Sequence, residues 1–286
     1  MNPLPRLAPM LWSVVVVLLL ARPAFGQEGA SREQQASDAP LVFVRAGDIP
    51  ILLSAPHGGR RAIPDVPERK ADGEKQFVTS RDDNTAELTM KLAEELEKHL
   101  HGKPFVVVAH FERKYLDVNR PAEDAYEVDA AKLVYERYHA ALRQSCQTIR
   151  KHWPHGLLLD IHGQAAEPDK IIRGTANGDT VKLLVERHSR AAVIGPRSLF
   201  GALHEAGIPV LPKLETDDRE VKFNGGHIVR TYGSHRDGGL DAIQLELGTD
   251  FRKKAKLDET ARAVTEAIRT HCTHYLPDAV GKGPPQ

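Results

Sequence analysis

The sequence predicts an α/β fold with a mainly parallel or mixed sheet, and two observations carry this prediction. Short apolar runs, which are typical of buried strands, alternate along the chain with longer segments whose apolar residues recur at helical spacing. Two of the apolar runs also end in a histidine followed by glycine, at His57 and at His162. Because open α/β sheets bind ligands beyond the carboxyl ends of their strands, these histidines mark the expected site.

The expected strands are short, apolar and bounded by turn-forming residues. They cover residues 41–44, 51–54, 105–109, 157–161, 171–172, 209–212 and 242–247. The turn at residues 46–48 is expected to join the first two strands as a hairpin. Residues 60–80 are charged, rich in proline and glycine and without period, which predicts a surface loop long enough to suggest a function.

The helices are expected where apolar residues repeat every three or four positions. They cover residues 84–100, 130–153, 181–190, 197–206 and 256–275. In the first of them, four leucines recur at every fourth position. Asp82 and Asp83 stand before this helix, where a carboxylate can cap free amides, so capping is the simplest account of one of the two.

The chain is expected to divide into four parts. Residues 1–26 have an early arginine, an aliphatic run of about ten residues and small residues at 24–26, which predicts a cleaved secretory signal peptide. A membrane anchor is the alternative, but such a run is well below the roughly 20 residues that span a bilayer. Residues 27–39 are expected to be a flexible lead-in, residues 40–278 a single catalytic domain, and residues 279–286 a disordered tail.

Charge and cysteine content limit the partners and the sources of stability. Lys and Arg together number 39, as do Asp and Glu, so nothing favours nucleic acid or an anionic membrane as the main partner. The two cysteines, Cys146 and Cys272, are too few for a disulfide framework, and the sequence leaves open whether they pair.

Four polar features follow or interrupt the apolar runs: His57, the Asp82/Asp83 pair, His162 and Glu246. Two imidazoles and a carboxylate with room for water are the usual ligands of a hydrolytic zinc site. Zinc lowers the pKa of its water toward about 7, and a separate carboxylate then moves the proton.

Glu246 is the best candidate for that separate carboxylate, because a core-facing acid inside an apolar strand is costly unless it is functional or paired. The alternative places Glu246 on the solvent side of an edge strand, on the same face as Gln244. Asp160 either orients His162 as a ligand or is an ordinary acid at a strand end.

A second group of polar residues follows the strand at 105–109. Arg113, Asn119 and Arg120 suit recognition of a carboxylate, and Asp117 can hold one of them in place. A salt-bridged loop is the alternative. His227 and Arg230, after a glycine turn, are weaker candidates for substrate binding.

Taken together, these motifs resemble the N-formylglutamate amidohydrolase family. The matching segments are Ser54-Ala55-Pro56-His57-Gly58, Arg81-Asp82-Asp83-Asn84, Arg113 with Asp117-Val118-Asn119-Arg120-Pro121, Leu158-Leu159-Asp160-Ile161-His162, Gly225-Gly226-His227-Ile228 with Tyr232-Gly233, and Gln244-Leu245-Glu246-Leu247. The resemblance implies a three-layer mixed sheet flanked by helices, like that of zinc exopeptidases. It also implies metal ligation by His57, Asp82 and His162, with Glu246 as general base.

The same resemblance implies that Asn119 and Arg120 clamp a substrate carboxylate and that Arg113 polarises the scissile carbonyl. The family's acidic element is similar to Asp-x-Asp, whereas this chain has Asp82-Asp83-Asn84, so Asp82 is chosen as ligand and Asp83 as the better helix cap.

The expected function is that of a secreted or periplasmic zinc-dependent hydrolase. It would cleave an N-formyl or N-acyl amino acid, or a peptide C–N bond, next to a free carboxylate by means of metal-activated water. The alternatives are a metallocarboxypeptidase acting on peptides or cell-wall fragments, and a non-catalytic periplasmic binding protein for amino-acid-like anions. No nucleic acid and no lasting membrane anchor are expected.

Overall fold

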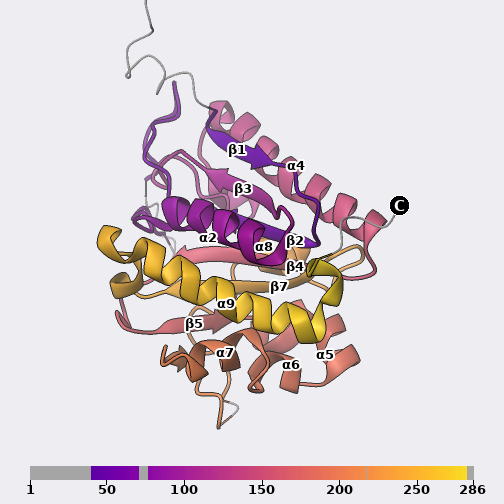
Figure 1. Ribbon diagram of the computed structural model, residues 1–286. Coiled ribbons are helices and arrows are strands. Elements are labelled where there is room, and N and C mark those ends of the chain that lie inside the picture. The colour runs from indigo at the N-terminus through magenta and orange to yellow at the C-terminus, as the bar shows by residue number, and fades with distance from the viewer. Residues whose placement is uncertain (1–39, 71–76, 217, 282–286) are drawn as a thin grey trace, which may run out of the picture. The chain divides into compact units, whose positions relative to one another are not determined.

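The core of the protein is a seven-stranded sheet in the order β1-β3-β2-β4-β7-β5-β6 (Figure 1). The computed structural model describes residues 40–70, 77–216 and 218–281. The strands are β1 (Val42–Arg45), β2 (Ile51–Ala55), β3 (Phe105–Ala109), β4 (Leu157–Gly163), β5 (Ile171–Gly174), β6 (Val210–Leu211) and β7 (Asp241–Leu247). The predicted signal peptide at 1–26 and lead-in at 27–39 lie outside the described residues.

The sheet is mixed. Its four central strands, β3, β2, β4 and β7, run parallel, while β1 and β5 pair antiparallel with β3 and β7. The parallel strands bring their carboxyl ends to one edge, where His162 of β4 lies in register with Glu246 of β7. The site residues therefore meet at this edge, as the fold class predicts.

The predicted hairpin between the first two strands is wrong. β1 pairs with β3, and both edges of β2 are occupied by the parallel strands β3 and β4. The turn after β1 is held against the chain that enters β3, because the amide of Asp48 donates to the carbonyl of Lys103 at 2.8 Å. β2 is buried at every position and so takes the centre of the sheet, while the partly exposed β1 takes its edge.

Helices cover both faces of the sheet and complete the predicted three-layer α/β architecture, which is confirmed. One apolar core cluster lies under α2 (Thr85–Leu100), α9 (Leu257–Tyr275), α7 (Leu199–Glu205), α6 (Ala191–Ile194) and α5 (Lys182–His188). The other lies under α4 (Asp129–His152) and α8 (His227–Tyr232), with the short α3 (Ala122–Ala125) beside them. Figure 1 shows α2 and α9 side by side in front of the strands and α4 behind them.

Cys146 and Cys272 lie in these two different clusters, and both are free thiols. Stability therefore comes from the two apolar layers, whose burial is the main favourable term in folding. No helix in the described ranges is both long and apolar enough to span a bilayer.

The carboxyl-terminal boundary lies later than predicted. Ala279, the first residue of the predicted disordered tail, is fully buried in a 3-10 turn at Pro277–Ala279. The amide of Gly281 donates to the carbonyl of Leu100 at 3.2 Å, so the chain is held against the end of α2 up to this residue.

His271 of α9 provides a test of how stability depends on pH. It is 2% exposed, and burial, followed by the nearby His188 and Arg187, lowers its pKa from 6.5 to about 4. As the pH falls through this window the unfolded chain takes up a proton that the folded chain does not, so stability is lost. We expect the free energy of unfolding in urea to fall between pH 7 and pH 4 in both proteins, and to fall by up to about 3 kcal/mol less in His271→Leu than in the parent.

The matched control is His274→Leu at an exposed position of the same helix. Equal slopes of unfolding free energy against pH in the parent and in His271→Leu would contradict the expectation.

Candidate active site

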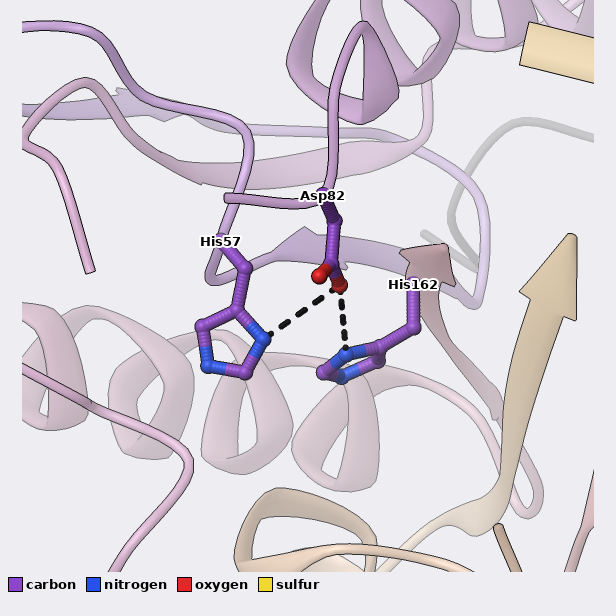
Figure 2. A group of neighbouring side chains, drawn as sticks. All are labelled: His57, Asp82 and His162. Carbon is purple, nitrogen blue, oxygen red and sulfur yellow. Dashed lines mark hydrogen bonds and ion pairs between the residues drawn. The ribbon is translucent and has the colours of Figure 1, made fainter. Parts of the chain in front are cut away.

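Three side chains from separate elements converge at the carboxyl edge of the sheet (Figure 2). His57 follows β2, Asp82 precedes α2, and His162 lies near the end of β4. Their potential ligand atoms all lie within 4.8 Å of one another, and all three residues are buried. Asp82 Oδ2 is 3.4 Å from His57 Nδ1 and 3.3 Å from His162 Nδ1. The structure thus brings together the residues predicted as metal ligands, while ligation itself stays a prediction.

Each imidazole is oriented by a carboxylate on its far nitrogen. His57 Nε2 donates to Asp117 Oδ1 at 2.7 Å, and His162 Nε2 donates to Asp160 Oδ2 at 2.8 Å. These bonds orient the two rings so that both Nδ1 atoms face Asp82, the arrangement that metal-ligating histidines usually have. His57 Nδ1 is buried and makes no hydrogen bond. A cation held by the two Nδ1 atoms and Asp82 fits this donor set.

The charges of the cluster also favour a cation at its centre. Burial alone would raise the pKa of the Asp82 carboxyl, but the two histidines hold this pKa well below its usual range. Burial would lower the pKa of His162, yet Asp160 and Asp82 hold it well above its usual value. The buried carboxylates Asp82 and Asp160 thus favour positive charge between them. Protonated His162 carries it here, and a divalent ion that displaced the Nδ1 proton would supply it instead.

The two adjacent aspartates have different surroundings. Asp82 Oδ2 points into the cluster and accepts a hydrogen bond from the amide of Gly163 at 3.0 Å. The Asp83 side chain is 62% exposed and pairs with Arg81. Neither carboxylate caps α2, whose N-cap is Asn84 in a left-handed conformation without a side-chain bond. The expectation that Asp83 caps the helix is therefore wrong, because its side chain turns toward Arg81.

Glu246 lies beside the cluster on a central strand, so the alternative of an exposed edge position is wrong. It is 5% exposed, and burial raises its pKa to about 7, with His162 opposing the shift. Gln244 Nε2 donates to Glu246 Oε1 at 2.8 Å, while Gln244 Oε1 accepts from the amide of Gly226 at 2.7 Å. Gln244 therefore holds one carboxylate oxygen in place.

This role of Gln244 was missed in the sequence, although a signal was present. The two-residue alternation of a strand places Gln244 on the same face as Glu246. A polar pair on one face of an apolar strand is the pattern that reveals such a contact.

The predicted polar loop after β3 reaches the site. Asp117 Oδ2 accepts from Arg113 Nε at 2.8 Å, and Arg113 Nη1 lies 3.9 Å from Asp82 Oδ1. Arg113 is 8% exposed, so it is not part of an ordinary surface salt bridge. Asn119 Oδ1 accepts from the amide of Ile228 at 2.8 Å. Asn119 thus also anchors the start of α8.

Two glycines beside His57 allow close packing of protein backbone. A Cβ on Gly58 would lie 2.3 Å from the amide nitrogen of Ala86, and one on Gly59 would lie 2.2 Å from the carbonyl of Phe111. The backbone that passes close to these glycines is that of α2 and of the segment after β3.

A cavity of about 670 Å³ opens over these side chains. Seven of the nine predicted site residues line it, namely His57, Asp82, Arg113, Asn119, Arg120, His162 and Glu246. The predicted functional loop contributes Val78 and Ser80.

His227 and Arg230 do not line this cavity. Arg230 is exposed, and its guanidinium donates to the Gly225 carbonyl and to Asn224 Oδ1. His227 is half-buried against His139, with 5.6 Å between ring centroids. In this structure Arg230 holds the glycine turn, and no contact directs His227 toward Glu246.

Comparisons with known proteins agree with these observations. The family model described as N-formylglutamate amidohydrolase matches residues 49–133. An N-formylglutamate deformylase from Pseudomonas aeruginosa is 25% identical over 270 residues, covering 81% of this chain and 95% of the relative.

Two solved structures share the fold. The crystal structure of an N-formylglutamate amidohydrolase from Ralstonia eutropha superposes with a TM-score of 0.55 at 14% identity, covering 82% of this chain and 97% of the other. A gene product of Agrobacterium tumefaciens also gives a TM-score of 0.55, at 15% identity over 84% of this chain and 96% of its own. Together with the motifs that occur from residue 54 to residue 247, the family-model match and the deformylase relative show that the chain is similar to the N-formylglutamate amidohydrolase family.

Proposed function

We propose that this protein is an exported, zinc-dependent enzyme that cleaves an amide bond next to a free carboxylate. One observation carries the proposal: His57 and His162 are each tied at Nε2 to a carboxylate, so that both Nδ1 atoms face Asp82 beside the buried Glu246. Zinc accepts imidazole and carboxylate ligands of this kind and keeps a position open for water in hydrolytic sites.

His57, Asp82 and His162 would hold the ion. When bound, zinc lowers the pKa of water and polarises a carbonyl. Glu246 takes the proton of the attacking water and later gives it to the leaving nitrogen. Gln244 occupies Oε1 of this carboxylate, which leaves Oε2 for the proton, since no described side chain engages that oxygen.

The arginines supply the positive charge around the substrate. Asp117 holds Arg113 through Nε, and Arg113 Nη1 lies 3.9 Å from Asp82 Oδ1, so this end of the guanidinium would stabilise negative charge on the carbonyl oxygen. Arg120 also lines the cavity and suits the substrate carboxylate. Asn119 Oδ1 accepts from the amide of Ile228, which leaves Nδ2, 3.3 Å from His162 Nε2, as the donor that Asn119 can offer to this clamp.

Metal content and activity together test the proposal. We expect protein purified without chelators to hold about one zinc per chain, in line with a single three-residue ligand set. It should hydrolyse N-formyl or N-acyl amino acids, lose activity on dialysis against a chelator and regain it with zinc. His57→Ala should lose both metal and activity. Stoichiometric zinc absent from the parent, together with unchanged hydrolysis by His57→Ala, would overturn the mechanism.

Export is proposed from residues 1–26 alone, which carry Arg6, an aliphatic run and a small-residue cleavage pattern. Amino-terminal sequencing of the mature protein from its native cells should begin near residue 27. A mature chain that begins at Met1 would contradict this part of the proposal.

A further inference from the structure

A second cavity adjoins the one over Glu246. Its volume is about 660 Å³, close to that of the first, and the two share Val221, Lys222 and Phe223 as a wall. The opposite wall is also continuous, because Ala165 lines the first cavity and the next residue, Ala166, lines the second. The two cavities are therefore two ends of one cleft.

The order of the strands sets the direction of this cleft. Arg113 follows β3, and two predicted metal ligands follow β2. The third, His162, lies on β4, and Glu246 lies on β7. The second cavity lies beyond them, where it is lined by Ile172 of β5 and Leu211 of β6. Ile172 is the direct partner of Glu246 across the β5–β7 pair. The second cavity therefore lies across the catalytic centre from Arg113.

The cleft gathers exposed apolar side chains, with the charged residues Glu167, Lys213, Asp218, Arg219 and Lys222 among them in the second cavity. Among the described residues, five large hydrophobic side chains are exposed, and three of them, Val78, Val221 and Phe223, line the cleft. Val221 is 85% exposed at the shared wall. Exposed apolar side chains that gather at a cavity indicate a surface that contacts an apolar ligand.

The shared wall is held rigidly from beneath. The Glu220 carboxylate is 3% exposed and accepts hydrogen bonds from Arg173 Nε at 2.7 Å, from the amide and hydroxyl of Thr175, and from the amide of Asn177. The carbonyl of Asn224 accepts from the amide of Ala176 at 2.6 Å. A wall fixed in this way is formed before any ligand arrives, which favours binding.

We propose that the second cavity is a subsite for an extended, apolar acyl group on the substrate amide. The inference rests on the proposed function. Arg120 binds the substrate carboxylate in the first cavity, where Arg113 stabilises the carbonyl oxygen. The acyl group then points away from both arginines, toward Ile172 and Leu211. A formyl group is too short to reach this cavity, whereas a medium-length aliphatic acyl group or an apolar peptidyl residue fills it.

The test compares hydrolysis of N-formyl-, N-acetyl-, N-hexanoyl- and N-octanoyl-L-glutamate by the zinc-loaded full chain. Each buried methylene contributes up to about fourfold, so we expect kcat/KM to rise at least about tenfold from N-acetyl to N-octanoyl. N-acetyl-leucyl-glutamate, cleaved before glutamate, distinguishes a peptidyl from an aliphatic preference. In the double variant Val221→Ser with Phe223→Ser, this gain should shrink to about threefold or less.

Val44→Ser is the matched control, because Val44 is another exposed valine, on the edge strand β1, and lines neither cavity. It should keep the full gain with acyl length. A second readout does not depend on turnover: Kd values of the same series for Glu246→Gln should fall with acyl length, and should fall less when Val221 and Phe223 are serine.

If kcat/KM does not rise, or Kd does not fall, as the acyl group lengthens, the subsite proposal is overturned, while the amidohydrolase proposal stays intact. Absence of hydrolysis of every compound, with length-dependent binding to Glu246→Gln, would instead count against the proposed reaction and support the cavity as an apolar acyl site.

Discussion

Replacement of Glu246 by glutamine is expected to lower kcat by about 10²–10⁴-fold, the usual contribution of a positioned general acid–base. Glutamine has the shape of the carboxylate and can keep the bond from Gln244, but it cannot take a proton from water. Zinc content and thermal stability should stay near those of the parent, because Glu246 is not among the predicted ligands. Steady-state kinetics and metal analysis on the same preparation measure both quantities.

The pH profile adds an independent check on Glu246. Burial raises its pKa to about 7, and the carboxylate is lost as the pH falls through this value. A bound cation nearby lowers the pKa, so the acid limb of kcat/KM should lie at or below pH 7. Glu136→Gln, at an exposed position of α4, is the matched control and should change neither rate nor profile. A Glu246→Gln enzyme with more than a tenth of parental kcat would exclude Glu246 as the base.

Asp82→Asn and Asp83→Asn form a pair of neighbouring substitutions with opposite expected outcomes. Asp82→Asn removes the charge that faces both Nδ1 atoms, and should weaken zinc binding by more than about 100-fold, since changes to residues that only support a ligand already lower affinity by 10–100-fold. Asp83→Asn changes an exposed side chain outside the cluster and should leave zinc affinity within about twofold, as surface substitutions usually do.

Competition with a chromogenic zinc chelator measures both affinities, and circular dichroism confirms that each variant folds. The asparagine at position 82 can still accept the amide hydrogen of Gly163, which protects the local structure. If Asp83→Asn loses zinc and Asp82→Asn retains it, the ligand assignment is reversed.

Local patterns in the sequence were sufficient to predict where helices and strands lie, but not which strands pair with one another. The helix at 85–100 and the strand at 241–247 lie close to their predicted bounds, because apolar periodicity reflects which face is buried. The pairing of β1 with β3 was not predictable from the turn after β1, since strand order depends on contacts between distant segments. A short turn between two apolar runs permits a hairpin without requiring it.

In the candidate site, too, some residues were predictable from the local sequence and others depended on the fold. His57, Asp82, His162 and Glu246 were identifiable, because polar residues at the ends of buried strands meet at one edge of a parallel sheet. Arg230 lies outside the lining of the cavity, which the sequence could not show, since a glycine turn beside a charged residue does not reveal which way the side chain points. The acyl subsite had no local signal, because its walls come from segments around residues 166, 172, 211 and 221 that only the fold assembles.

Asp117 supports two different side chains of the candidate site at once. One oxygen of its carboxylate steadies the imidazole of His57 and the other steadies the guanidinium of Arg113. Under the proposed function, a variant at this position therefore perturbs both the binding of the metal ion and the stabilisation of the scissile carbonyl oxygen. Substitutions of Arg113 that aim to change specificity must therefore keep Asp117 in place. Variant libraries in which position 117 is fixed should yield more active clones than libraries in which it varies.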